Sequence, residues 1–173
     1  MPSCQKEIGI RLRALEPDDI DLLYSVENNP DDWATGATTM PYSHDILRQY
    51  VLSTTGDIFT DKQLRLVIET TDNTPVGLID LTSFDPKNLH AEVGITILPS
   101  YRNKGYATMA LQQLETYASH TIHLHILYAV VGSDNICSLK LFENSGFSVT
   151  TELKDWLFDG HKYQNAMLLQ KII

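Results

Sequence analysis

The sequence has little cysteine, no long apolar run and no excess of basic residues. Its two cysteines, Cys4 and Cys137, lie far apart in 173 residues and fit neither a CxxC pair nor a zinc-ligand spacing. This scarcity favours a reducing compartment over a disulfide-stabilised secreted scaffold. No apolar run approaches the ~20 residues that span a bilayer, and the first residues lack the apolar core of a signal peptide. We therefore expect a cytoplasmic protein with no membrane partner.

The net charge of −9 argues against a nucleic-acid partner, because recognition of nucleic acid normally needs a basic face. The charge is unevenly distributed. Residues 1–90 contain 15 acidic and 7 basic residues, whereas residues 91–173 contain 7 acidic and 6 basic ones. Two interpretations remain open: the acidic half is solvated surface, or it attracts a cationic small molecule.

Repeats, low-complexity tracts and Pro/Gly/Ser-rich linkers are also absent, so we expect a single domain over residues 1–173. Alternating and helical spacings of apolar residues predict most of the elements, and the run without alternation at 124–131 predicts a strand with both faces covered. The predicted strands cover 8–15, 64–70, 75–84, 90–98 and 124–131, with a final hairpin in 151–170 around Asp159-Gly160; the predicted helices cover 16–29, 44–52, 104–118 and 133–145. This order predicts an α/β fold of the α+β kind, in which a mixed, largely antiparallel sheet of six to seven strands carries about four helices.

The segment PSYRNKGYATMAL, residues 99–111, joins a predicted strand to a predicted helix. It has neither the GxxxxGK[ST] pattern of a P-loop nor the GxGxxG pattern of a dinucleotide fold. A helix N-terminus still offers unpaired N–H groups, and Gly105 would let an anion approach the backbone. Taken alone, the segment is equally consistent with an anion site and with a plain turn.

A second motif changes this balance. R-x-x-G-x-A at residues 102–107 follows one strand and precedes another, after which come N-x-x-S-x-x-L-F from Asn135 and G-F at 146–147. In this order the motifs resemble the GNAT superfamily of acetyl-CoA-dependent N-acetyltransferases. The resemblance covers nearly the whole chain. Within the superfamily, the chain is most similar to bacterial spermidine acetyltransferases and to enzymes that acetylate the N-termini of ribosomal proteins.

The resemblance implies acetyl-CoA as co-substrate and implies where it binds. The main chain of the strand before the loop would lie along the pantetheine arm, with a backbone N–H near Ile97 as oxyanion donor. The loop and first helical turn would wrap the pyrophosphate, and the next helix would approach the sulfur end. The implied cofactor-binding residues are Ile95, Thr96, Ile97, Arg102, Asn103, Lys104, Gly105, Tyr106, Ala107, Thr108, Asn135 and Ser138.

The chemistry requires a proton acceptor, because an amine attacks a thioester only when neutral and an alkyl ammonium has a pKa of about 10.4. Glu92 is the candidate base, since it shares a strand face with Gly94 and Thr96 near the expected acetyl group. The alternative role for Glu92 is binding of the substrate cation or of water. Many relatives place a Tyr, as general acid, where this chain has Phe142. Tyr128 on the preceding strand is the candidate substitute, with packing as its alternative role.

The acceptor stays open. Spermidine acetyltransferases carry acidic residues where this chain has Thr39-Met40 and Ser83, although Glu27, Asp31 and Asp32 lie nearby. We expect a small-molecule amine; the alternatives are the N-terminus of a protein such as a ribosomal protein, and a catalytically weak CoA-binding sensor. Aromatic residues that could line an acceptor pocket are Trp33, Tyr42, Trp156 and Tyr163. The histidines of HTIHLH supply no third ligand at a fixed offset, so we predict no metal. The oligomeric state, homo-oligomer included, is open.

Overall fold

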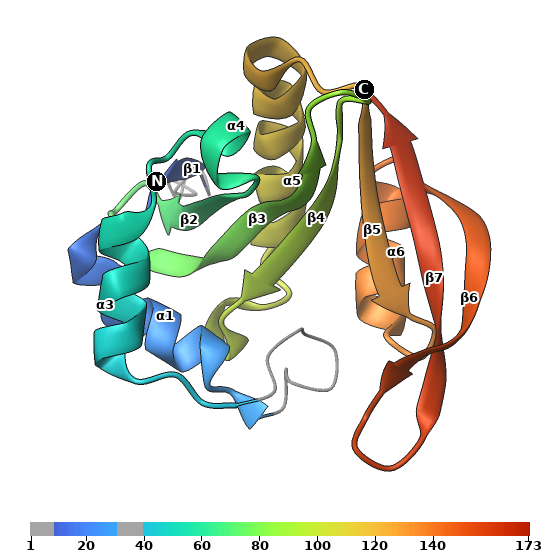
Figure 1. Cartoon of the computed structure of the whole chain (residues 1–173), viewed down its shortest axis with the longest axis horizontal. Helices are drawn as coiled ribbons and strands as arrows, with labels where there is room; N and C mark the ends of the chain where they lie inside the picture. The colour runs from blue at the N-terminus through green and yellow to red at the C-terminus, as the bar shows by residue number, and fades with distance from the viewer. Residues whose placement is uncertain (1–8, 31–39) are drawn as a thin grey trace, which may run out of the picture.

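A computed structural model describes residues 9–30 and 40–173 of the chain. Seven strands form one sheet in the order β1-β2-β3-β4-β5-β7-β6 (Figure 1). All neighbours are antiparallel except β4 and β5, which are parallel. The strands are β1 (Ile10–Ala14), β2 (Leu64–Thr70), β3 (Pro75–Asp85), β4 (His90–Ile97), β5 (Ile126–Gly132), β6 (Ser148–Phe158) and β7 (Tyr163–Ile172). The predicted mixed, largely antiparallel sheet is therefore confirmed.

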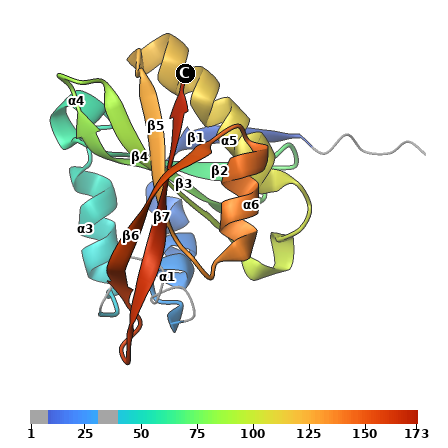
Figure 2. The same cartoon turned by 90° about the vertical axis from the view of Figure 1, so that its right-hand side faces the viewer.

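Helices cover both faces of this sheet. The described residues contain α1 (Ile20–Glu27), α3 (His44–Ser53), α4 (Ile58–Asp61), α5 (Tyr106–Tyr117) and α6 (Ile136–Asn144). In Figure 2, α1 and α3 lie on one side of the strands and α5 and α6 on the other. The sequence patterns had not indicated α4, because one turn is too short to show a helical period. The Asp57 side chain caps α4 by accepting from the Phe59 N–H.

One apolar core lies on each face of the sheet. The larger core lies under α5 and α6, and its fully buried members include Ile79, Leu114 and Leu127. The smaller core packs Leu23 of α1 and Leu47 of α3 against Val67 and Leu78 of the sheet. Strands β2 and β3 thus alternate side chains between the two cores, as the period of two predicts, whereas the buried residues of β4 belong to the larger core. This alternation leaves the polar residues of β3 and β4 on the α1 side.

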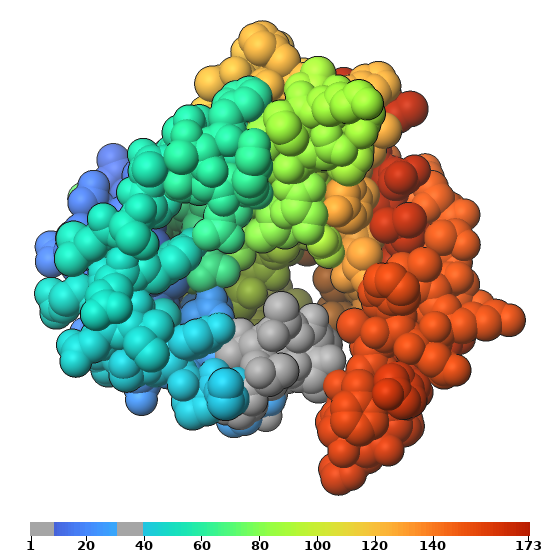
Figure 3. Space-filling view, in the orientation of Figure 1, coloured from blue at the N-terminus to red at the C-terminus, as the bar shows by residue number. Residues whose placement is uncertain are grey.

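The parallel pair is where the sheet opens. β4 and β5 pair only over His90–Glu92 and Ile126–Tyr128. Beyond this apex β4 stays with β3 as far as Ile97, while β5 stays with β7 as far as Gly132. The two halves therefore diverge, and Figure 3 shows a hollow between the half containing β4 and the half containing β5.

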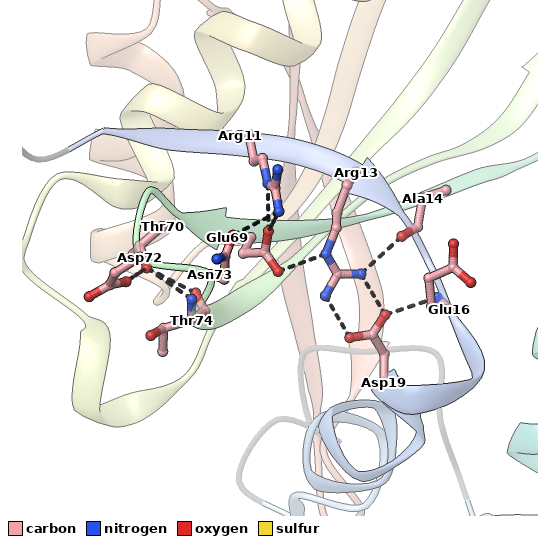
Figure 4. Close-up of polar contacts among 10 residues, drawn as sticks. All are labelled: Arg11, Arg13, Ala14, Glu16, Asp19, Glu69, Thr70, Asp72, Asn73 and Thr74. Atoms are coloured by element: carbon pink, nitrogen blue, oxygen red, sulfur yellow. Dashed lines mark hydrogen bonds and ion pairs between the residues drawn. The ribbon is translucent and has the colours of Figure 1, made fainter.

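Arginine contacts to two buried carboxylates tie the first strand to the first helix (Figure 4). The Arg13 guanidinium donates to both carboxylate oxygens of Asp19, at 2.6 and 2.8 Å, and to Glu69 at 2.8 Å. Burial would raise the pKa of Asp19, but the hydrogen bonds from Arg13 and from the Glu16 N–H, together with the charge of Arg13, hold that pKa below its ordinary value. Glu69 also accepts from Arg11 at 2.6 Å. These contacts fix the entry of α1 against β1 and β2.

The final hairpin has a four-residue connection that contains the predicted Asp159-Gly160. β6 ends at Phe158 and β7 begins at Tyr163, and the Asp159 carboxylate accepts the N–H groups of His161 and Lys162. An Asp that bonds backbone groups two and three residues ahead stabilises such a turn. Across the described ranges, no helix is both long and apolar enough to cross a membrane.

Candidate active site

The loop after β4 presents a row of backbone N–H groups. Asn103 and Gly105 have left-handed backbone conformations, with φ of 61° and 83°, and α5 starts directly after Gly105. Met109 is the first residue of this helix whose N–H is bonded, to the Gly105 carbonyl at 3.2 Å. Within the described residues, the N–H groups of residues 103–108 have no acceptor. A concave row of free donors at a helix N-terminus suits a pyrophosphate.

The two cations of this loop turn back onto its own carbonyls. Arg102 Nε donates to the Ile97 carbonyl at 2.9 Å, and Lys104 Nζ donates to the Ser100 carbonyl at 2.9 Å. The Lys104 ammonium also lies 5.1 Å from the centre of the Tyr101 ring. Both side chains therefore support the loop conformation, and the main chain supplies the donors that an anion would meet.

The open edge of β4 carries the second set of free main-chain groups. The Leu98 N–H bonds to the Val76 carbonyl at 2.9 Å, and the β3–β4 register is continuous from Ile97 back to Glu92. Because main-chain groups alternate in direction along a strand, Thr96 directs its groups to β3, whereas Ile95 and Ile97 direct theirs to the hollow. Of the three strand residues predicted to lie along the pantetheine arm, Ile95 and Ile97 therefore direct main-chain groups to the hollow, and Thr96 does not.

Glu92 lies at the apex of the opening, on the face that carries α1. It is half-buried and opposite Thr82 on one side and Tyr128 on the other. Burial raises its pKa above the ordinary value, and a hydrogen bond from the Ser83 hydroxyl at 3.5 Å acts in the opposite direction. A carboxylate with a raised pKa is a stronger proton acceptor.

Tyr128 lies directly across from Glu92, where the two strands begin to diverge. Its ring meets the His90 ring edge-on, with centroids 5.8 Å apart. Burial raises the pKa of its phenol, while a hydrogen bond with Ser83 lowers it. A cavity of about 170 Å³ adjoins the ring, lined by His90, Ile126, Tyr128, Leu168 and Gln170. His90 Nδ1 is buried there without a partner among the described residues.

Asn135 begins α6, the helix below β5. Its side-chain oxygen accepts from the Ser138 N–H at 3.1 Å, so Asn135 is the N-cap and α6 begins at Ile136, later than the predicted start at residue 133. The cap leaves the Asn135 amide nitrogen available beside Ser138. Phe142 is only 2% exposed and packs edge-on against Phe147 at 5.0 Å. It is part of the core and supplies no proton.

Sequence patterns missed an ion cluster beside this apex. Arg65 on β2 donates twice to Asp80 on β3, at 2.8 and 2.9 Å, and once to Glu27 of α1 at 2.5 Å. Burial raises the pKa of Asp80 although Arg65 opposes this. Asp80 is the register partner of Gly94, two residues from Glu92. The signal in the sequence is a charged residue inside an otherwise apolar strand, in LRLVIE and again in LIDL.

Other residues named from the sequence lie apart from this arrangement or outside the described ranges. Asp31, Asp32, Trp33 and Thr39 are among the residues that the structure does not describe. Tyr42, Trp156 and Tyr163 are exposed, the last two on the final hairpin. No group of three or more metal-binding side chains occurs in residues 9–30 and 40–173, the exposed His123 and His125 included. A larger groove of about 1190 Å³ lies elsewhere, between β1, α3 and α5.

Comparisons with known proteins identify the family. Residues 10–148 match the family described as acetyltransferase (GNAT) domain. Spermidine N(1)-acetyltransferase of Escherichia coli K12 is 30% identical over 171 residues, which cover 96% of this chain and 86% of that protein. A putative ribosomal N-acetyltransferase of Bacillus subtilis is 26% identical over 91% of this chain and 88% of its own.

A solved structure shows the same fold. The crystal structure of spermidine N-acetyltransferase from Vibrio cholerae in complex with CoA and spermine has a TM-score of 0.84 and 25% identity, and the match covers 94% of this chain and 95% of that one. The free N–H row of residues 103–108 and the open edge of β4 suit CoA. The chain therefore belongs to the GNAT family and is an acetyl-CoA-dependent N-acetyltransferase.

Proposed function

We propose that this enzyme acetylates a small molecule that carries a primary amine and binds as a cation, by direct attack in a ternary complex. The observation that carries the proposal is the position of Glu92, between the open edge of β4 and the Glu27–Arg65–Asp80 cluster. The donor approaches from one side of this residue and the acceptor from the other. Polyamines are the first class to test.

The donor site is built from main-chain groups. We assign the pyrophosphate to the N–H row of residues 103–108 and the pantetheine arm to the edge at Ile95 and Ile97, with Asn135 and Ser138 on the opposite wall. Acetyl-CoA supplies the thioester whose acetyl group is transferred. The Ile97 N–H is the oxyanion donor, because its carbonyl already accepts from Arg102 while its N–H faces the hollow.

Glu92 takes the proton of the attacking amine. Its raised pKa brings it closer to that of the amine than an exposed carboxylate would be, and its position at the apex brings it to the reacting atoms. Tyr128 gives a proton to the departing sulfur. It takes the place of the hydroxyl that Phe142 lacks, because it faces the same opening from the neighbouring strand.

The acceptor class follows from charge. The Glu27–Arg65–Asp80 cluster has two carboxylates for one guanidinium, and the first half of the chain is strongly acidic. A cationic amine is therefore attracted to the α1 side of the apex. The relatives named for spermidine acetylation match nearly the whole chain, which supports the same class here.

Release of free CoA thiol tests the proposal across polyamines, amino acids, aminoglycosides and peptides with free N-termini. We expect release with at least one small amine, together with an upward thermal shift on acetyl-CoA alone. Release with peptides only would favour N-terminal acetylation of a protein. A thermal shift without release for any amine would favour a CoA-binding sensor, and either result would overturn the proposal.

A cytoplasmic location is also proposed, on the scarcity of cysteine and on the supply of acetyl-CoA that the reaction needs. The oligomeric state is to be measured by light scattering. The exposed aromatic residues Trp156, Phe158 and Tyr163 on the final hairpin support a homo-oligomer, because such side chains commonly cover one another between subunits.

A further inference from the structure

Ser83 has a backbone conformation that serine rarely adopts. Its φ is +50°, in the left-handed region, at the point where the β3–β4 register shifts between Thr82 and Asp85. Non-glycine residues in this region are uncommon and concentrate at functional sites, where the surrounding structure holds them in place. The bulge turns the Ser83 side chain toward β4 and β5 in place of the regular alternation of the strand.

The Ser83 hydroxyl meets two side chains of the apex. It donates to Glu92 Oε2 at 3.5 Å, and its interaction with Tyr128 lowers the pKa of that phenol. The three residues come from three adjacent strands, β3, β4 and β5. The other titratable groups beside them are His90, which contacts the Tyr128 ring, and Asp85, which lies 3.7 Å from His90.

A serine hydroxyl has one proton to donate, and it donates best to a negatively charged acceptor. Before the reaction that acceptor is the Glu92 carboxylate. After Tyr128 has given up its proton, the acceptor is the phenolate. One hydroxyl can therefore serve both residues in turn, without any movement of the main chain.

We propose that Ser83 is a positioning residue that couples Glu92 to Tyr128 and returns to Tyr128 the proton that Glu92 removes from the amine. The proposal rests on the proposed function and deepens it. It explains why a strained serine stands at the bulge, and how Tyr128, whose phenol faces a carboxylate, is reset for the next turnover.

The proton count closes within these residues. The neutral amine nitrogen forms a bond to the acetyl carbon and gives one proton to Glu92. The carbon–sulfur bond breaks with its electron pair on sulfur, and Tyr128 gives its proton to that sulfur. Ser83 then passes its proton to the Tyr128 phenolate and takes the proton held by Glu92. One proton has moved from nitrogen to sulfur, as the conversion of amine and thioester to amide and thiol requires; an acceptor that arrives as ammonium first loses one more proton to solvent.

The variant Ser83→Gly tests the coupling. Glycine adopts positive φ readily, so this change removes the hydroxyl while relieving the backbone strain, and the fold is expected to survive. We expect kcat to fall about tenfold, with the KM for acetyl-CoA unchanged. Loss of the hydrogen bond to the Glu92 carboxylate raises the pKa of Glu92, so the acidic limb of the pH profile moves to higher pH.

Asp155→Gly is the matched control. Asp155 is also a non-glycine residue with positive φ at a register shift, in β6, and its main-chain N–H donates to the Asn165 side chain. We expect this variant to keep the wild-type kcat and pH profile. If Asp155→Gly changed kcat and the pH profile as Ser83→Gly does, the cause would be increased flexibility of a bulge. This result would contradict the proposal.

A double-mutant cycle with Tyr128→Phe tests whether the two residues act together. If Ser83 acts through Tyr128 as well as through Glu92, the kcat of the double variant should be about equal to that of the slower single variant. Independent, multiplicative losses would contradict the coupling.

NMR titration of the Glu92 carboxyl measures its pKa without any enzymatic turnover. Its pKa should rise in Ser83→Gly and not in Asp155→Gly. If wild-type protein releases thiol but this pKa and the pH profile stay unmoved, the role of Ser83 is wrong and the proposed function stands. If no amine gives thiol release, the proposed function fails, while the titration still decides whether Ser83 contacts Glu92 as inferred.

Discussion

Gly105 matters at the residue scale because the donors of the proposed anion site belong to the main chain. Its φ of +83° turns the chain into α5, and a Cβ built on it would touch nothing within 4 Å. A side chain at this position therefore causes backbone strain rather than a collision. The strain reaches the site directly, since residues 103–108 lie on both sides of this residue.

The variant Gly105→Val should lose acetyl-CoA binding. A positive φ costs a β-branched residue about 1–2 kcal/mol. The loop would relieve this strain through a backbone shift that misaligns its N–H groups. Isothermal titration should show a Kd raised by roughly 100-fold or more. Lys104→Ala should only weaken binding, because Lys104 contacts the Ser100 carbonyl. Gly56→Val is the control, with φ +74° and equally open space outside the site; equal loss in that variant would contradict the account.

Glu92→Gln should lower kcat by about 10²–10⁴-fold, the range for loss of a general base. The pH dependence of kcat/KM provides a second test of this role. Burial raises the pKa of Glu92, so in wild type kcat/KM rises with pH as Glu92 deprotonates at a pH above the ordinary carboxyl value. The amide that replaces the carboxyl group in this variant cannot titrate, and this limb should disappear. Unchanged turnover across the pH range would remove Glu92 as the base.

At the scale of elements, β3 and β4 approach each other closely beside the open edge of β4. A Cβ added at Gly77 of β3 would lie 2.2 Å from the Thr96 carbonyl oxygen and 3.0 Å from the Ile97 Cα. Both are main-chain atoms, which cannot rotate away. The glycine thus allows β4 to hold Ile95 and Ile97 at the open edge.

Gly77→Ala should displace this end of β4. We expect a lower free energy of unfolding, by about 1–3 kcal/mol, and a raised Kd for acetyl-CoA. Denaturant unfolding and titration measure the two effects. Gly94→Ala is the matched change on β4, where the added Cβ meets Asp80 at an ordinary 3.7 Å, and its unfolding free energy should stay near wild type. Equal stability of the two variants would mean that the close approach at Gly77 is not limiting.

The ion cluster joins α1 to the sheet and has its own pH signature. Arg65→Met leaves the Asp80 carboxylate without the guanidinium that it contacts, which should cost about 3–5 kcal/mol near neutral pH. Asp80 already has a raised pKa in the folded protein, so it contributes stability below its unfolded pKa that is lost as pH rises. The deficit of the variant should therefore shrink as pH falls toward the ordinary carboxyl range.

Denaturant unfolding at several pH values measures this deficit. Arg48→Met, on the exposed side of α3, is the control and should be close to wild type at every pH. A deficit for Arg65→Met that did not depend on pH would show that packing, rather than charge, accounts for the loss.

Element order was predictable because each strand and the longer helices carry their own periodicity. The sequence patterns did not predict the one-turn helix α4 or the cap of α6. Ser133, Asp134 and Asn135 are all residue types that cap helices, and the main-chain angles decide which of them does so. The motifs pointed to the cofactor loop, but the directions of the Ile95, Thr96 and Ile97 groups depend on register. Arg65, Asp80 and Ser83 could not be grouped from the sequence, because the sheet order brings them beside Glu92.

At the scale of the whole molecule, the proposed reaction draws on both halves of the sheet. The half formed by β1 to β4 supplies Glu92, the anion loop and the acidic cluster, while the half formed by β5, β7 and β6 supplies Tyr128 and the wall at Asn135. The apex at Glu92 and Tyr128 is where the two halves meet. Acetyl transfer at this apex is the central claim.

Thiol release coupled to acetylation of the amine tests that claim most directly. Wild-type enzyme is incubated with acetyl-CoA and each small amine, and free CoA and acetylated amine are quantified together. We expect equal amounts of the two products with at least one cationic primary amine, and loss of both in Glu92→Gln. Stabilisation by acetyl-CoA with no thiol released for any amine, or equal release by Glu92→Gln, would contradict the account.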